Sequence, residues 1–171
     1  MDAWSRIGAT IATEFSDIND LEQLTRVCLR LLLAALLGAI LGIEREHAGK
    51  AAGIRTHMLV AMGGALFVLV PLQGGMDTEG LSRVIQGVVA GVGFLCAGTI
   101  LKAKDEEQVH GLTTAAGLWM TAAIGVAAGL GREMTAVISA LFAFAILALE
   151  QPLRRLVKKK VHEVKDATGH Q

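Results

Sequence analysis

Five long stretches of the chain are almost free of charged residues. They cover residues 27–43, 58–73, 84–101, 112–130 and 134–149. Each is close to the roughly 17–25 residues that a helix needs to cross a bilayer core of about 30 Å. Five helices that are apolar on all sides cannot all be interior in a chain of 171 residues, which argues against a large soluble helical core. The sequence therefore predicts an all-α fold, a polytopic membrane bundle with about five transmembrane helices.

The basic residues are distributed unevenly between the two sides of this predicted bundle. Eleven of the 16 lysines and arginines fall in the loops 44–57 and 102–111 and in the tail from Glu150. Cytoplasmic segments carry the excess of Lys and Arg, so we expect the C-terminus in the cytoplasm and the N-terminus outside. The formal net charge is zero, and we expect no nucleic-acid partner.

The two ends of the chain carry different patterns, and we divide the chain at residues 26 and 150. Residues 1–26 place apolar side chains at helical spacing, which predicts an extracytoplasmic amphipathic helix, and Asp20 with Gln23 predicts the cap of the first span. The acidic residues in this segment argue against a secretory signal peptide. Residues 27–150 form the predicted transmembrane domain. Residues 151–171 form a basic cytoplasmic tail, either an amphipathic helix on anionic lipid or a solvated segment.

Glycines recur at a spacing of four inside three of the predicted spans. The pairs are Gly38 with Gly42, Gly87 with Gly91, and Gly125 with Gly129. Small residues at this spacing let helix backbones approach closely in a membrane, where packing rather than water drives association. We therefore expect a compact bundle and a homodimer, with Trp119 packed against glycine faces in the middle of its span.

Three segments appear in a recognisable order and spacing. They are GIEREHAGKAAGIRTHMLVAMGGALF, GVVAGVGFLCAGTIL and VHGLTTAAGLWMTAAIGVAAGLG. With them, residues 31–147 closely resemble the membrane domain of the MgtC/SapB family. The residues that carry the resemblance are Glu44, Arg45, Gly53, Arg55, Thr56, Gly91, Gly93, Phe94, Gly98, Gly111, Leu112, Thr113, Thr114, Ala115, Trp119, Gly125, Gly129 and Gly131.

The resemblance implies a multi-pass protein of the bacterial inner membrane, linked to growth in scarce magnesium and, in pathogens, to virulence through survival inside phagocytes. We expect a regulatory or interaction protein of this type, whose partner is the lipid bilayer, a second copy or another inner-membrane protein. Longer members append a soluble domain that resembles ACT modules. About twenty residues follow the last span here, so ligand sensing by such a domain is not carried over.

The segment between the first two spans holds most of the candidate site residues. We expect Glu44, Arg45, Arg55, Thr56 and His57 to form a polar cluster on the cytoplasmic side together with Thr113 and Thr114. Glu44 and Glu46 oppose the negative end of the helix dipole, so they need a cation such as Arg45 or Arg55. Thr56 is the expected cap of the second span, and Thr113 or Thr114 that of the fourth.

Three roles for this cluster are compatible with the sequence. It is a clamp of ion pairs, a site for an anion or lipid headgroup, or a divalent-cation site that adds Asp105, Glu106 and Glu107. The last two roles fit the alternative function, a small transporter or channel for an ion or phosphate. No motif of a nucleotide-binding loop, zinc protease or activated nucleophile is present, so we expect no enzyme activity, cofactor or metal centre.

Overall fold

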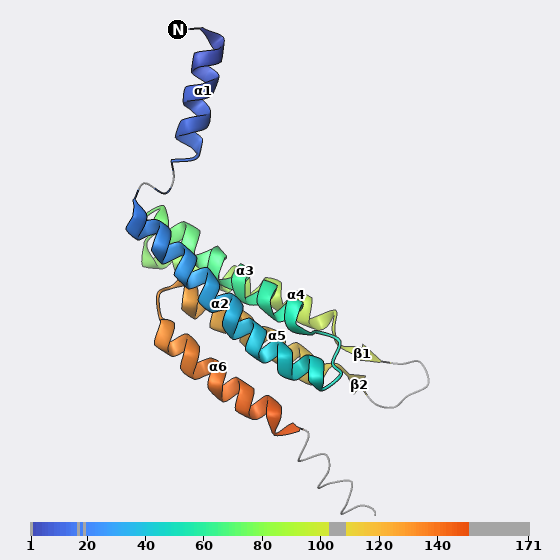
Figure 1. Cartoon of the computed structure of the whole chain (residues 1–171). Helices are drawn as coiled ribbons and strands as arrows, with labels where there is room; N and C mark the ends of the chain where they lie inside the picture. Colours follow the sequence, from blue (N-terminus) through green and yellow to red (C-terminus); the bar gives the residue numbers. More distant parts are fainter. Residues whose placement is uncertain (1, 17, 19, 103–108, 151–171) are drawn as a thin grey trace, which may run out of the picture.

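The computed structural model describes residues 2–16, 18, 20–102 and 109–150, which form a helical bundle with one very short hairpin (Figure 1). The elements are α1 (Ala3–Glu14), α2 (Leu21–His47), α3 (Ile54–Gln73), α4 (Thr78–Ala97), β1 (Leu101–Lys102), β2 (Val109–His110), α5 (Leu112–Gly129) and α6 (Glu133–Ala148). β1 and β2 pair antiparallel, with Leu101 opposite His110. The fourth helix accordingly ends at Ala97, before the end of the stretch 84–101.

Four helices, α2 to α5, are long and apolar enough to cross a membrane, which confirms the expected helical membrane bundle. The fifth apolar stretch forms α6, which has only 16 residues and is about 24 Å long at 1.5 Å per residue. α2 begins at Leu21 because the Asp20 carboxylate accepts a hydrogen bond of 2.5 Å from the backbone N–H of Gln23. The cap predicted from these two residues is therefore confirmed.

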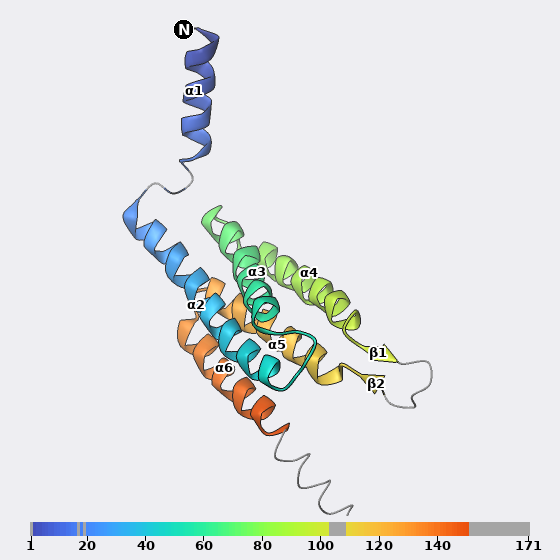
Figure 2. The same cartoon turned by 45° about the vertical axis from the view of Figure 1, so that its right-hand side comes forward.

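Helix α5 lies at the centre of the bundle, where it contacts α2, α3, α4 and α6, and α3 packs most extensively against α2 and α5. α6 covers the opposite side of α2 and α5, and α4 lies along the far edge (Figure 2). This arrangement produces unequal burial. In the apolar stretch of α5, 56% of the residues are buried inside the chain, whereas the corresponding share in α4 is 6%. α4 therefore presents most of its surface to whatever surrounds the bundle.

Two of the three glycine pairs lie where helices touch. A Cβ atom on Gly42 would lie 2.5 Å from the Cα of Ile54, and one on Gly125 would lie 2.0 Å from the carbonyl oxygen of Ala61. Gly38 and Gly129 face the backbone of α3 equally closely. These four glycines let α2 and α5 contact α3 backbone to backbone.

The third glycine pair departs from the expectation. A Cβ atom on Gly87, Gly91 or Gly93 would meet nothing within 4 Å, because α4 is the edge helix and this part of it faces open space. Gly98 follows the end of α4 as its C-cap residue.

Trp119 also differs from its expected setting. Its ring is 47% exposed and lines a small cavity of about 130 Å³ with valines and alanines of α4 and α5 rather than a glycine face.

Helix α1 stands away from the bundle and buries no residue (Figure 1). Its apolar side chains, including Trp4 and Ile11, are exposed, and their spacing predicted this helix. The predicted helix in the basic tail, residues 151–171, lies outside the described residues.

Candidate functional site

The largest fully buried side chain of the described residues is a charged one, Arg45, near the C-terminal end of α2. It lies on the same helix face as Gly38, Leu41 and Gly42, at positions i, i+3, i+4 and i+7, all of them buried. The glycines of this face admit the α3 backbone. The arginine continues the face toward the end of α6.

The Arg45 guanidinium binds three acceptors. Nε donates to the carboxylate of Glu44, one terminal nitrogen donates to Glu150 Oε2 at 2.9 Å, and the other donates to the carbonyl oxygen of Leu147 at 3.1 Å. The Leu147 carbonyl belongs to the last turn of α6, where carbonyls lack partners within the helix and the dipole favours a cation. Arg45 therefore ties the end of α2 to the end of α6, 102 residues later.

Glu150 is held by a second cation. Lys50 Nζ, in the loop after α2, donates to Glu150 Oε1 at 2.6 Å. Burial raises the pKa of Glu150, but the hydrogen bonds and charges of Lys50 and Arg45 lower it by more, so this pKa lies below its ordinary value. We call Glu44, Arg45, Lys50 and Glu150 the Arg45 cluster. Two carboxylates and two cations balance one another in it.

The caps of α3 and α5 are not the threonines that the sequence suggested. α3 begins at Ile54, whose N–H donates to Glu46 Oε2 at 3.0 Å, so Glu46 stabilises the positive end of α3. Thr56 lies inside the first turn and makes no cap. α5 follows Gly111, whose φ of 94° favours glycine, and neither Thr113 nor Thr114 caps it. Thr114 is instead buried along the helix, and Thr113 is exposed.

His57 is completely buried beside the Arg45 cluster. Its Nδ1 lies 3.0 Å from the carbonyl oxygen of Gly53, so Nδ1 carries the hydrogen in this contact. Nε2 has no hydrogen-bond partner among the described residues and points toward Gly117 of α5, where a Cβ atom would lie 3.7 Å away. The residue therefore lies inside the bundle.

Arg55 does not join the cluster. Its side chain is exposed and makes no ion pair with any residue that the structure describes. The sequence offered Arg45 and Arg55 as partners for the carboxylates, and only Arg45 fills that role. The reason is geometric, because Arg55 lies on a different face of α3 from the buried residues His57 and Ala61.

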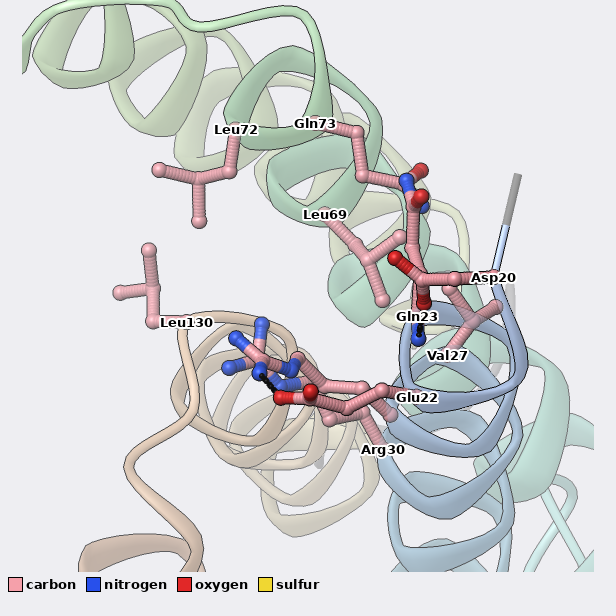
Figure 3. A pocket seen from close by; sticks show the side chains of 10 residues that line it. Asp20, Glu22, Gln23, Val27, Arg30, Leu69, Leu72, Gln73 and Leu130 are labelled. Carbon is pink, nitrogen blue, oxygen red and sulfur yellow. Dashed lines mark hydrogen bonds and ion pairs between the residues drawn. The ribbon is translucent and has the colours of Figure 1, made fainter. Parts of the chain in front are cut away.

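A second polar region lies at the opposite end of the bundle (Figure 3). It is an open cavity of about 540 Å³ between the start of α2 and the ends of α3 and α5. At its base Arg30 donates to the carbonyl oxygen of Gly129 at 3.1 Å and lies 3.7 Å from Glu133. Arg30 thereby stabilises the C-terminal end of α5.

The structure thus brings Glu44 and Arg45 together and adds two residues that sequence reasoning did not assign to the site, Lys50 and Glu150. Glu150 was visible as the acidic residue directly after the last apolar stretch. Asp105, Glu106 and Glu107, the further ligands of the cation hypothesis, lie outside the described residues. Within the described part of the chain, no three His, Cys, Asp or Glu residues are grouped so that they could hold a metal ion.

Comparison with known proteins identifies the family of this chain. The model of the MgtC family matches residues 31–156, most of the chain. The chain belongs to the MgtC family. This match spans the described helices from within α2 to α6 and includes the Arg45 cluster.

Individual relatives agree with that assignment. SrpB of Synechococcus elongatus is 46% identical over 138 residues, which cover 74% of this chain and 76% of SrpB. The putative magnesium transporter YhiD of Escherichia coli is 41% identical over 142 residues, or 78% of this chain and 65% of YhiD. MgtC of Salmonella typhimurium is 46% identical over 104 residues, or 61% of this chain and 43% of MgtC. The chain thus spans less than half of MgtC and less than two thirds of YhiD, and no solved structure matches it significantly.

Proposed function

We propose that this protein is a non-enzymatic regulatory protein of the bacterial inner membrane that acts in magnesium-limitation homeostasis by contacting another membrane protein or lipid. The family membership and the name of YhiD as a putative magnesium transporter support the link to magnesium. We extend the same proposal to a role in virulence in pathogens that carry such a protein.

The observation that carries the regulatory part of the proposal is the mutual pairing of the Arg45 cluster within the described residues. Both carboxylates accept from Arg45, and Glu150 also accepts from Lys50. Removing one partner from a buried ion pair costs about 3–5 kcal/mol, which is too much for a group that must release its partner in every transport cycle. The cluster is therefore suited to hold α2 against α6 rather than to exchange ions.

The orientation belongs to the same proposal. The excess of Lys and Arg beside the Arg45 end supports an orientation with that end in the cytoplasm, the N-terminus outside and α6 as the fifth crossing. Reporter fusions test it. Alkaline phosphatase that carries its own export signal and is fused before α1 is expected to be active. Green fluorescent protein fused after Gln171 is expected to fluoresce. Two ends on the same side would contradict the five crossings.

The expected homodimer is also part of the proposal, but its contact surface is not formed by the glycine pairs of α2 and α5. The glycine pairs of α2 and α5 are covered inside the chain, so a second copy would meet the outer face of α4 around Phe94, which is 86% exposed. Phe94→Ala is expected to shift a dimer to monomer in light scattering of the purified protein. A purely monomeric wild type would end this part of the proposal.

The alternative function is a small transporter or channel for an ion or phosphate, and the name of YhiD, a putative magnesium transporter, favours magnesium as its cargo. Two measurements separate the functions. The regulatory proposal expects the chain to restore growth in limiting magnesium to a host that lacks its own MgtC-family protein, while liposomes holding the purified protein show no magnesium or phosphate flux above empty vesicles. Flux above that background would establish transport. If the chain did not restore growth although it was present in the membrane at normal abundance, both functions would be contradicted.

A further inference from the structure

An apolar groove lies between α3 and α4, away from the Arg45 cluster. It has a volume of about 550 Å³, within the range of roughly 300–1,000 Å³ that is usual for small-ligand sites. Its lining consists of aliphatic, aromatic and glycine residues: Leu59, Val60, Gly63, Gly64, Phe67, Val84, Gly87, Val88, Gly91, Val92 and Leu95. Cβ atoms on Gly63, Gly87 and Gly91 would meet nothing within 4 Å, so the missing side chains give the groove its width.

The groove is about as long as one leaflet of the bilayer is thick. Along α3 it extends from Leu59 to Phe67, and along α4 from Val84 to Leu95. At 1.5 Å per residue these lengths are about 12 and 17 Å, close to half of a hydrocarbon core of about 30 Å. A partner helix that crosses the membrane would need a groove along the full length of both helices, whereas a lipid chain needs only half.

One end of the groove carries the positive charge of Arg55. Arg55 lies one turn before Leu59 on α3, at the i, i+4 spacing that puts two side chains on one helix face. Its side chain is exposed and has no ion pair among the described residues. A guanidinium binds phosphate through paired, charge-assisted hydrogen bonds. The rim therefore matches an anionic headgroup, and the groove below it matches an acyl chain.

We propose that this groove holds an anionic phospholipid of the leaflet at the Arg55 end, with an acyl chain between α3 and α4 and its phosphate on Arg55. The lipid fills the space that the open glycines of α4 leave. This site is distinct from the Arg45 cluster, so the proposal holds whichever of the two functions above applies.

The test is native mass spectrometry of the full-length protein in detergent with equal amounts of dioleoyl phosphatidylglycerol and dioleoyl phosphatidylcholine. The wild type is expected to bind the anionic lipid about tenfold better, because both lipids offer a phosphate to Arg55 but that of phosphatidylcholine is already neutralised by its own ammonium group. Arg55→Gln is expected to remove this preference, and Arg55→Lys to keep part of it. A preference that survives in Arg55→Gln would overturn the headgroup assignment.

Two glycine variants test the groove. Gly91→Leu puts into the groove a side chain whose Cβ atom meets nothing within 4 Å, and it is expected to weaken binding of both lipids at least about fivefold, a value that corresponds to roughly 1 kcal/mol. Gly93→Leu is the matched control, because Gly93 is equally unobstructed but does not line the groove. Equal lipid binding by these two variants would overturn the proposal. A loss of dimer in Gly91→Leu with unchanged lipid binding would assign the groove to a second copy and overturn it as well.

Discussion

Replacing Arg45 by glutamine removes the cation on which both carboxylates of its cluster depend. The Arg45 side chain is 0% exposed, and those of Glu44 and Glu150 are 9% and 15% exposed, so water cannot compensate either carboxylate well. Breaking a buried ion pair by removing one partner costs about 3–5 kcal/mol. We expect a loss in this range, toward its lower end because Lys50 still binds Glu150.

The measurement is the free energy of unfolding in mixed micelles, followed by far-ultraviolet circular dichroism as the denaturing detergent is increased. Arg55→Gln is the control, because the same substitution at an exposed residue without an ion pair among the described residues is expected to stay within about 0.5 kcal/mol of the wild type. A double variant, Arg45→Met with Glu150→Leu, is expected to recover part of the loss, since an apolar pair can replace a buried ionic one. Equal stability of Arg45→Gln and Arg55→Gln would refute the clamp.

Two further predictions follow from the packing and from the pKa of Glu150. Gly42→Ala places a methyl group 2.5 Å from the Cα of Ile54 and is expected to cost about 1–3 kcal/mol, whereas Gly93→Ala meets nothing within 4 Å and is expected to be neutral or to stabilise α4 by up to about 1 kcal/mol in the same assay. Because the pKa of Glu150 is lowered, its contribution to stability is complete above its ordinary value of 4.5 and is lost as the pH falls through the lowered pKa. Unfolding measured between pH 7 and pH 3 is therefore expected to show a smaller acid-induced loss in Glu150→Gln than in the wild type. An unchanged pH dependence in Glu150→Gln, or a Gly42→Ala variant as stable as Gly93→Ala, would contradict these two predictions.

Helices α2 to α6 could be predicted from the sequence because each contains a long apolar run, and charged and turn residues separate one run from the next. The same is true of the cap at Asp20, which depends only on residues three positions apart. Local patterns of this kind are visible along the chain.

The partners within the candidate site could not be predicted in this way. Arg45 and Glu150 are 105 positions apart, and only the packing of α6 against α2 brings them together. The glycine pairs show the same limit, because Gly87 with Gly91 has the same spacing as Gly125 with Gly129. One faces open space and the other faces the α3 backbone, since α4 is an edge helix and α5 is central.

The threonine caps were wrong for a related reason. The helix starts that they were expected to cap use glycine, once with φ of 94° at Gly111 and once with help from the carboxylate of Glu46. A carboxylate eight residues before the N–H that it binds is not a recognised capping signal.

The contact of Arg45 with the end of α6 imposes an order on biosynthesis. A ribosome produces Arg45 about a hundred residues before it reaches Leu147 and Glu150. Throughout that interval the guanidinium has only neighbouring Glu44 as a counterion, and the nascent bundle lacks its final tether. Closure of the bundle therefore waits for the synthesis of the end of α6 and of Glu150, and a product truncated within α6 would carry an exposed, half-neutralised arginine by which quality-control proteases could recognise it.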